Sequence, residues 1–337
     1  MHYFLRLRCA AVFATFTAAW SSVASAAEID GLNIPDDFAG HLVATQTIQT
    51  GYIDDLTPGQ GFGEGSELNQ LFVDPNVDDG FLKIGVTGNL DNYPFPDGPV
   101  HGFVFFFDTV AGGKSTLDEF VPGVDGERFL LPLLDARFDV GFEPDFALVI
   151  NAVSPRGLPN STFYVDLFDL SLVSKRYLGR GAVGSGTGLL IEGENPDGMM
   201  LALDNSNTAG VHGEEPGELD AGAASATSGM ELSIPISYLS LAPGADLGVH
   251  AMITSHALYT ASSLQRHAEG FSNQSLPPFP VGTLNGTYSR RDPDVLDFRT
   301  LEGDQFARVR IVPEPTTVSA CGLSLMVACW RFRRPTV

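Results

Sequence analysis

The segment Gly102–Thr109, with the sequence GFVFFFDT, constrains most strongly how this chain can fold. Phe105, Phe106 and Phe107 are consecutive, so in a β-strand their side chains alternate between the two faces of the sheet. Both faces of such a strand must then be covered by other apolar groups. The segment therefore predicts a strand in the middle of a β-sandwich.

Short apolar runs separated by glycine and proline extend this pattern along the chain. The sequence contains 37 glycines and 22 prolines, which are spread along the chain and separate segments rich in Val, Ile, Phe, Tyr and Thr. The predicted fold class is all-β: an antiparallel β-sandwich, jelly-roll-like, with short helical turns. Two smaller β units are the alternative. We expect strands at His41–Gln49, Ser66–Val73, Phe81–Thr87, His101–Asp108, Phe146–Val153, Thr162–Phe168, Met199–Leu203, Glu231–Ile236, Gly248–Thr254 and Phe306–Ile311.

Turn residues indicate how some of these strands are connected. Within residues 71–86, two apolar runs flank a Pro/Asn/Asp/Gly cluster, and Asp79-Gly80 predicts the turn of a hairpin. Residues 229–236 alternate between apolar and polar and are followed by a helical or turn-like piece. Two stretches rich in Gly, Ala, Ser and Glu are expected to form long surface loops, namely Gly179–Gly188 and Thr208–Gly229.

The N-terminus has the organisation of a secretory signal peptide. Arg6 and Arg8 precede an apolar segment that runs from residue 9 to residue 20. Small residues follow at Ala24 and Ala26, where signal peptidase would recognise the chain. We therefore expect residues 1–26 to be removed by cleavage after Ala26, and the body of the protein to be exported.

The C-terminal segment, residues 313–337, has three parts: a Pro-Glu-Pro tripeptide, an apolar run from Val318 to Trp330, and a basic end. An apolar helix is stable in hydrocarbon because its backbone hydrogen bonds are internal, and arginines just beyond it prefer the cytoplasmic side. The pattern predicts a short transmembrane segment, with a buried C-terminal helix or strand as the competing interpretation. The residues of this predicted signal are Pro313, Glu314, Pro315, Arg331, Arg333 and Arg334.

This order of tripeptide, apolar run and arginines resembles the PEP-CTERM sorting signal of bacterial proteins that exosortases process. The resemblance implies cleavage near the tripeptide and transfer of the body, residues 27–312, to the cell envelope, the cell surface or the extracellular matrix. Signal peptidase and an exosortase would be its partners during export. Because exosortase systems accompany exopolysaccharide production, the resemblance also makes a polysaccharide or another surface protein the expected later partner.

Composition limits the chemistry that the body can perform. The three cysteines and two tryptophans of the chain all lie in the two terminal segments, so the body has no disulfide, zinc–thiolate site or cysteine nucleophile. The chain carries 41 acidic residues against 19 Lys and Arg, a formal net charge of −22. Such a surface repels nucleic acid and anionic lipids, and it attracts divalent cations.

A second resemblance covers most of the body. The segments GSELNQLFV, LKIGVTGNL, FVFFFDTVAGG, DNSNTAGV, GMELSIPISYL, SNQSLPP and LEGDQFARV are similar to those of PEP-CTERM proteins of unassigned function. The strands ending in FFFDT also resemble family-9-type carbohydrate-binding modules. Those modules stack sugars on tryptophan, which this body lacks. Tyrosine and phenylalanine in or near Gly/Pro-rich segments are the remaining stacking candidates, with plugging of the sandwich ends as their alternative role: Tyr52, Phe62, Tyr93, Phe95, Tyr164, Tyr259, Phe279 and Tyr288.

Three motifs that suggest chemistry lack the context they need. Residues 179–184 match GxGxxG, but more glycine follows instead of a helix that would meet a pyrophosphate. Residues 74–80 begin like an EF-hand loop, but the glycine is one place late and Gly85 replaces the bidentate glutamate. His250 and His256 would share a strand face at a separation of about 20 Å, too far for one metal ion.

Calcium is the one cofactor for which we find candidate ligands. Short oxygen-bearing side chains at the ends of expected strands suit six to eight oxygen ligands, although turn capping is the common role of such residues. A structural calcium site somewhere in the body is better supported than any single group of ligands. The candidate residues are Asp204, Asn205, Asn207, Asp91, Asp97 and Asp108.

These observations favour an exported, exosortase-processed, non-catalytic protein that contacts polysaccharide or surface partners. A secreted polysaccharide-active hydrolase or lyase on the same sandwich is the first alternative. It would require two carboxylates at catalytic separation in a cleft. A purely structural matrix or coat component, self-associating through divalent cations, is the second.

Overall fold

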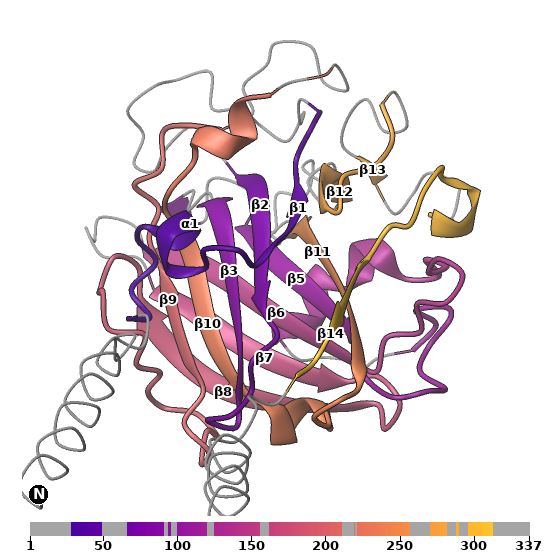
Figure 1. Ribbon diagram of the computed structural model, residues 1–337, viewed down its shortest axis with the longest axis horizontal. Helices are drawn as coiled ribbons and strands as arrows, with labels where there is room; N and C mark the ends of the chain where they lie inside the picture. Colours follow the sequence, from indigo (N-terminus) through magenta and orange to yellow (C-terminus); the bar gives the residue numbers. More distant parts are fainter. Residues whose placement is uncertain are drawn as a thin grey trace, which may run out of the picture.

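The computed structural model describes residues 28–48, 66–90, 94–95, 100–119, 125–155, 162–210, 219, 221–256, 270–281, 288–289 and 296–312. These residues form an all-β protein in which two mainly antiparallel sheets pack face to face (Figure 1). The smaller sheet has the order β1 (Leu42–Thr45), β2 (Glu67–Asp74), β3 (Phe81–Asn89), β10 (Gly229–Pro235) and β9 (Met200–Leu203).

The larger sheet contains the phenylalanine-rich strand. Its order is β13 (Tyr288–Ser289), β12 (Gly270–Leu276), β11 (Asp246–His256), β5 (Val100–Asp108), β6 (Phe146–Pro155), β7 (Thr162–Asp169) and β8 (Ser174–Ala182). β14 (Ala307–Arg310) also pairs with β11, and the short β4 (Pro94–Phe95) runs parallel to β6. Strands from the early and late parts of the chain share both sheets, because β3 pairs with β10 and β5 pairs with β11.

The strand predictions are confirmed for every expected segment, with boundaries that differ by a few residues. The predicted hairpin at Asp79-Gly80 joins β2 to β3, and Gly80 has the positive φ of 83° that such a turn requires. β10 ends at Pro235 and is followed by the 3₁₀ turn η4 (Ile236–Leu239), as the change of pattern predicted. The remaining turns are η1 (Asp125–Phe129), η2 (Leu131–Leu133), η3 (Gly222–Ser225) and η5 (Phe298–Thr300).

One loop prediction is partly wrong. Residues 179–182 of the stretch Gly179–Gly188 belong to β8, which pairs with β7 along its whole length. Gly181 is needed there because an added Cβ would lie 2.3 Å from the ring of Phe163 on the neighbouring strand. Glycine in this segment therefore permits close packing of strands, whereas the sequence pattern suggested a loop.

The phenylalanine-rich strand β5 is covered on both faces, as predicted. Phe103, Phe105 and Phe107 point into the main core between the two sheets. Val104 and Phe106 point the other way, into a second core on the outer face of the larger sheet. Residues of the ranges 117–119, 125–142 and 296–306 cover that face with side chains such as Phe138 and Phe298.

A third, smaller apolar cluster lies on the outer face of the smaller sheet. The short helix α1 (Ile34–Asp37) packs Ile34 and the following Phe38 against Phe72 of β2. Figure 1 shows α1 lying over this sheet, beside the strands β3 and β10. Gly85 of β3 allows the approach, because a Cβ at that position would lie 2.6 Å from Ile34 Cγ2. The N-terminal segment, defined here as residues 28–38, thus forms a cover over the sheet.

No helix within the described ranges has the length and apolar character needed to cross a membrane. The residues of the two predicted export signals lie outside these ranges: Ala24, Ala26, Pro313, Glu314, Pro315, Arg331, Arg333 and Arg334.

Candidate functional site

A glutamate on the covered face of the smaller sheet is the centre of the candidate site. In β10, Met230, Leu232 and Ile234 point into the main core, so Glu231 points to the opposite, outer face. Its direct neighbours across the sheet are Gly85 on β3 and Ala202 on β9. Both neighbours are small, which leaves room above the sheet for the carboxylate and for the chain that crosses it.

The N-terminal segment closes over this glutamate and fixes one of its oxygens. The backbone N–H groups of Asp30 and Gly31 each donate a hydrogen bond of 2.8 Å to Glu231 Oε2. Gly31 has φ of 83°, and its carbonyl oxygen accepts a hydrogen bond from the N–H of Gly229 at the start of β10. The segment is thereby held against the strand that carries Glu231, which has no exposed surface.

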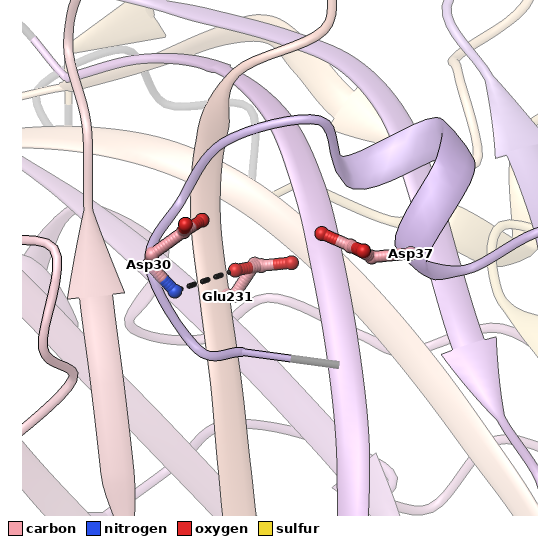
Figure 2. A group of neighbouring side chains, drawn as sticks. All are labelled: Asp30, Asp37 and Glu231. Carbon is pink, nitrogen blue, oxygen red and sulfur yellow. Dashed lines mark hydrogen bonds between the residues drawn. The ribbon is translucent and has the colours of Figure 1, made fainter. Parts of the chain in front are cut away.

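Three carboxylates converge at this point. The side chains of Asp30, Asp37 and Glu231 each offer an oxygen, and these oxygens all lie within 4.8 Å of one another. Figure 2 shows the Glu231 carboxylate between the two aspartates, with one oxygen toward the Asp30 backbone and the other toward Asp37. Glu231 is buried, Asp30 is half-buried and Asp37 is exposed, so the group opens to solvent on the Asp37 side. We call these three residues the acidic triad.

The electrostatics of the acidic triad are unfavourable when all three groups are ionised. Burial raises the pKa of Glu231 to about 7, and the charges of Asp37 and Asp30 add to the effect, while the two backbone hydrogen bonds oppose it. The pKa of Asp37 is also raised, first by burial and then by Asp30 and Asp36. Among the described residues, no lysine, arginine or histidine forms an ion pair with the triad. The arrangement therefore suits either a bound proton or a bound cation.

The calcium ligands expected from the sequence are placed separately. Asn205 exchanges two hydrogen bonds with the backbone of Leu90, and the Nδ2 group of Asn207 donates to the carbonyl of Ala209. Oδ1 of Asp204 accepts from the backbone N–H and the hydroxyl of Ser206. Asp204 and Asn207 thus bond within their own turn, whereas Asn205 connects that turn to the end of β3. Asp204 lies beside Gly31 of the N-terminal segment.

Asp108 lies far from that group. It ends β5 and its Oδ2 accepts a hydrogen bond of 3.2 Å from the backbone N–H of Glu143. His101, at the opposite end of β5, contacts Ser66, and the adjacent Glu67 pairs with Asn89 next to Leu90, the partner of Asn205. At the usual rise per residue of a strand, Asp108 is about 23 Å from His101 and hence from that end of the sandwich. Burial raises the pKa of Asp108, and its hydrogen bond to Glu143 opposes the shift. Asp91 and Asp97 lie outside the described residues.

The other motifs also have defined positions. Asp74, Asn76 and Asp79 each accept a hydrogen bond from a backbone N–H two residues later, which is how Asx side chains cap turns. In the GxGxxG stretch, residues 179–182 complete β8 and a turn follows, so the strand-to-helix context of a dinucleotide site does not occur there. His250 and His256 both lie on β11.

An aromatic pair lies on the outer face of β7 and β8. Tyr164 is paired across the strands with Arg180, and Tyr177 is paired with Asp166, so the two rings are diagonal neighbours on one face. Both tyrosines are half-buried. Burial raises the pKa of Tyr177, with a further contribution from Tyr164. Arg180 donates two hydrogen bonds, of 2.8 and 2.7 Å, to the carboxylate of Glu192.

A shallow depression of about 270 Å³ adjoins this pair. Hydroxyl groups of threonine and serine line it together with exposed apolar side chains, of which Leu189 is 65% and Ile191 is 49% exposed. Ile191 pairs with Arg180 in an isolated bridge, so the depression continues the face formed by the tyrosines. The other aromatic candidates are Phe279, which is buried in the second core, and Tyr52, Phe62, Tyr93, Phe95, Tyr259 and Tyr288, whose side chains are outside the described set.

Sequence reasoning did not select the acidic triad. The alternation of β10 was visible and places Glu231 on the face opposite the core, where a glutamate is normally solvated. The triad joins this residue to a segment far earlier in the chain, since Asp30 precedes Glu231 by 201 residues. No local spacing reports such a contact.

Compared with protein-family models, curated proteins and solved structures, the chain gives no match. Its function is therefore inferred from the arrangement of its own residues.

Proposed function

We propose that this chain is an exported, non-catalytic protein of the cell surface or extracellular matrix, and that it contacts polysaccharide through the outer face of β7 and β8. The tyrosine pair Tyr164–Tyr177 is the observation that carries the proposal. Aromatic faces offer apolar area to the C–H groups of a sugar ring, and the adjacent Arg180–Glu192 pair offers donors and acceptors for its hydroxyls. The neighbouring depression, lined by hydroxyls and apolar groups, extends this surface along one direction.

The fold and the export route complete the proposal. Long connections bring β10 beside β3 and β11 beside β5. On this basis we classify the sandwich as jelly-roll-like. The terminal sequence patterns support removal of residues 1–26 and processing near Pro313–Pro315 by an exosortase, with a short membrane segment before cleavage. Mass spectrometry of the protein from the surface fraction of its host should find an N-terminus at Ala27 and no residues beyond the tripeptide. An intact chain in the cytoplasm would contradict this route.

The binding proposal is tested by sedimentation with a panel of insoluble polysaccharides in calcium buffer. The double variant Tyr164→Ala/Tyr177→Ala should lose about tenfold in affinity for the bound polysaccharide, since two stacked rings contribute about 1–3 kcal/mol together. The matched control Tyr164→Phe/Tyr177→Phe keeps both rings and should retain most of the binding. Equal retention of the alanine variant and the wild type would refute the assignment of this face.

The same tubes distinguish the two alternatives. Soluble sugar in the supernatant would indicate a hydrolase or lyase. Among the described residues, the acidic triad is the group in which three carboxylates converge, and its Glu231 is covered by the N-terminal segment instead of facing a cleft. If the protein is not retained and releases no sugar, but self-associates when calcium is present, it is a purely structural matrix or coat component.

A further inference from the structure

One oxygen of Glu231 has no hydrogen-bond partner although the residue is fully buried. Oε2 accepts from the backbone of Asp30 and Gly31, but Oε1 has no partner. It faces Asp37 inside the acidic triad (Figure 2). A buried acceptor without a partner is strongly unfavourable, because its lost hydration is not replaced. An unsatisfied oxygen of this kind, directed at two further carboxylates, indicates that a ligand belongs between them.

We propose that Asp30, Asp37 and Glu231 bind one calcium ion, which fixes the N-terminal segment to the outer face of the smaller sheet. This site differs from the groups suggested by the sequence and lies away from the tyrosine face. It therefore does not depend on the polysaccharide proposal.

The spacing of the oxygens fits a single calcium ion. Calcium–oxygen bonds are about 2.4 Å long, so two ligands of one ion can be separated by up to about 4.8 Å. The three triad oxygens lie within 4.8 Å of one another, so a shift of at most about 0.4 Å in each would let all three contact one ion. Magnesium bonds of about 2.1 Å require a tighter set, within about 4.2 Å. The exposed side at Asp37 provides the entry path and room for water ligands.

Charge and local backbone support the same conclusion. A divalent cation offsets most of the mutual repulsion of the three carboxylates. The backbone bonds from Asp30 and Gly31 orient Glu231 so that Oε1 faces the group, in the manner of supporting contacts around metal ligands. Gly85 and Ala202 leave room above the sheet for the N-terminal segment that carries Asp30 and Asp37.

The ion would connect two distant parts of the chain. Asp30 and Asp37 belong to the cover, whereas Glu231 belongs to the sheet. Without the ion, the cover is held by a few backbone hydrogen bonds, including that of Ile34 N–H to the Thr227 carbonyl, and by the contacts of Ile34 and Phe38 with Phe72. Calcium should therefore protect the amides of Asp30 and Gly31 from hydrogen exchange.

The proposal is tested by calorimetric titration of the purified, chelator-treated protein with CaCl₂, followed by thermal melting at about pH 8. We expect a calcium-binding event and a rise in melting temperature of about 5 °C when calcium is one hundred times its Kd. Asp37→Asn is the main variant, because the side chain is exposed and the substitution keeps its size. Glu231→Gln keeps an oxygen that can accept from the two backbone N–H groups. Each variant should weaken calcium binding at least about tenfold.

Two control variants make the result specific. Asp36→Asn removes a neighbouring exposed charge that is not part of the triad, and its affinity should stay within about twofold of the wild type. Asp204→Asn tests the site expected from the sequence. The proposal is overturned if calcium does not raise the melting temperature, if Asp37→Asn binds like the wild type, or if Asp204→Asn abolishes binding that Asp37→Asn retains. Magnesium binding as tight as calcium binding would overturn the choice of ion.

Discussion

His250 should make the stability of this protein fall in mild acid. It lies on β11 with its ring buried in the second core, and its Nδ1–H donates a hydrogen bond of 2.6 Å to the carbonyl of Gln305. Nε2 is therefore the basic nitrogen, and it is buried with no hydrogen-bond partner. Protonation would place a charge among aromatic rings, of which the nearest centroids are those of Phe298 at 5.3 Å and of Phe106 and Phe279 at 6.3 Å.

The size of the effect follows from the pKa. Burial lowers the pKa of His250 from 6.5 to about 4, although the bond to Gln305 opposes the shift. The unfolded chain takes up this proton at higher pH than the folded protein, so the free energy of unfolding falls as pH drops from about 6.5 toward about 4. With about 1.4 kcal/mol per pKa unit, this histidine should lower the free energy of unfolding by about 2 kcal/mol between about pH 7 and about pH 4.5.

Urea unfolding across this pH range, with wild type and His250→Phe in parallel, measures the contribution. Phenylalanine fills the aromatic site but does not titrate, so the variant should lose about 2 kcal/mol less than the wild type over the interval. His101, whose pKa burial lowers to about 3, titrates in both proteins and cancels. His41→Gln, at a partly exposed position outside the aromatic core, is the control for the replacement of a histidine as such. Parallel curves for wild type and His250→Phe would refute the reasoning.

Three further variants test other parts of the structure. In chelator, the contribution of Glu231 to stability should fall as pH rises from about 4.5 through about 7, because the unfolded chain releases this proton first. The stability of Glu231→Gln relative to wild type should therefore rise over that interval and reach about 2 kcal/mol in favour of the variant at about pH 8, by urea unfolding. Gly85→Ala should destabilise by about 2 kcal/mol in the same assay, since its Cβ would overlap Ile34, and unchanged stability would contradict the packing of α1. Lys175→Met should cost about 3 kcal/mol, because it removes the 2.8 Å ion pair with buried Asp166, and the thermal midpoint should fall accordingly.

The strands that sequence reasoning found are those whose side chains alternate or are apolar throughout. In β5 the consecutive phenylalanines require two covered faces, and the structure provides one core on each side. The hairpin at Asp79-Gly80 was equally predictable, since only a few residue types adopt the backbone of that turn. In both cases the determining contacts lie within a strand or between sequence neighbours.

The strands that it missed have other compositions. β8 contains Gly179 and Gly181, which suggest a loop until the ring of Phe163 is seen to require a residue without a side chain. β12 is polar, and its Gln274 is buried because it bonds to the backbone of β2 through Leu68 N–H and the Ser66 carbonyl. Polar side chains in a core depend on partners that only the folded chain supplies.

The candidate sites follow the same division. Turn-forming aspartates and asparagines, such as Asp204, were visible as groups, but the same chemistry serves turn capping and calcium binding, and local sequence does not separate the two roles. Tyr164 was a stacking candidate from the sequence, whereas its neighbour Tyr177 and the depression beside them appear only once β7 and β8 are paired.

The sequence by itself determined the strand periodicity, the acidic surface and the absence of cysteine chemistry in the body, because these depend on residue type and short-range spacing. Tertiary structure alone decided that Glu231, on the outer face of its strand, would be buried. The N-terminal segment returns across the sheet and places two aspartates beside that glutamate. The burial of a carboxylate, and with it the shift of its pKa, depends on the residues that cover it, and here those residues are far away along the chain.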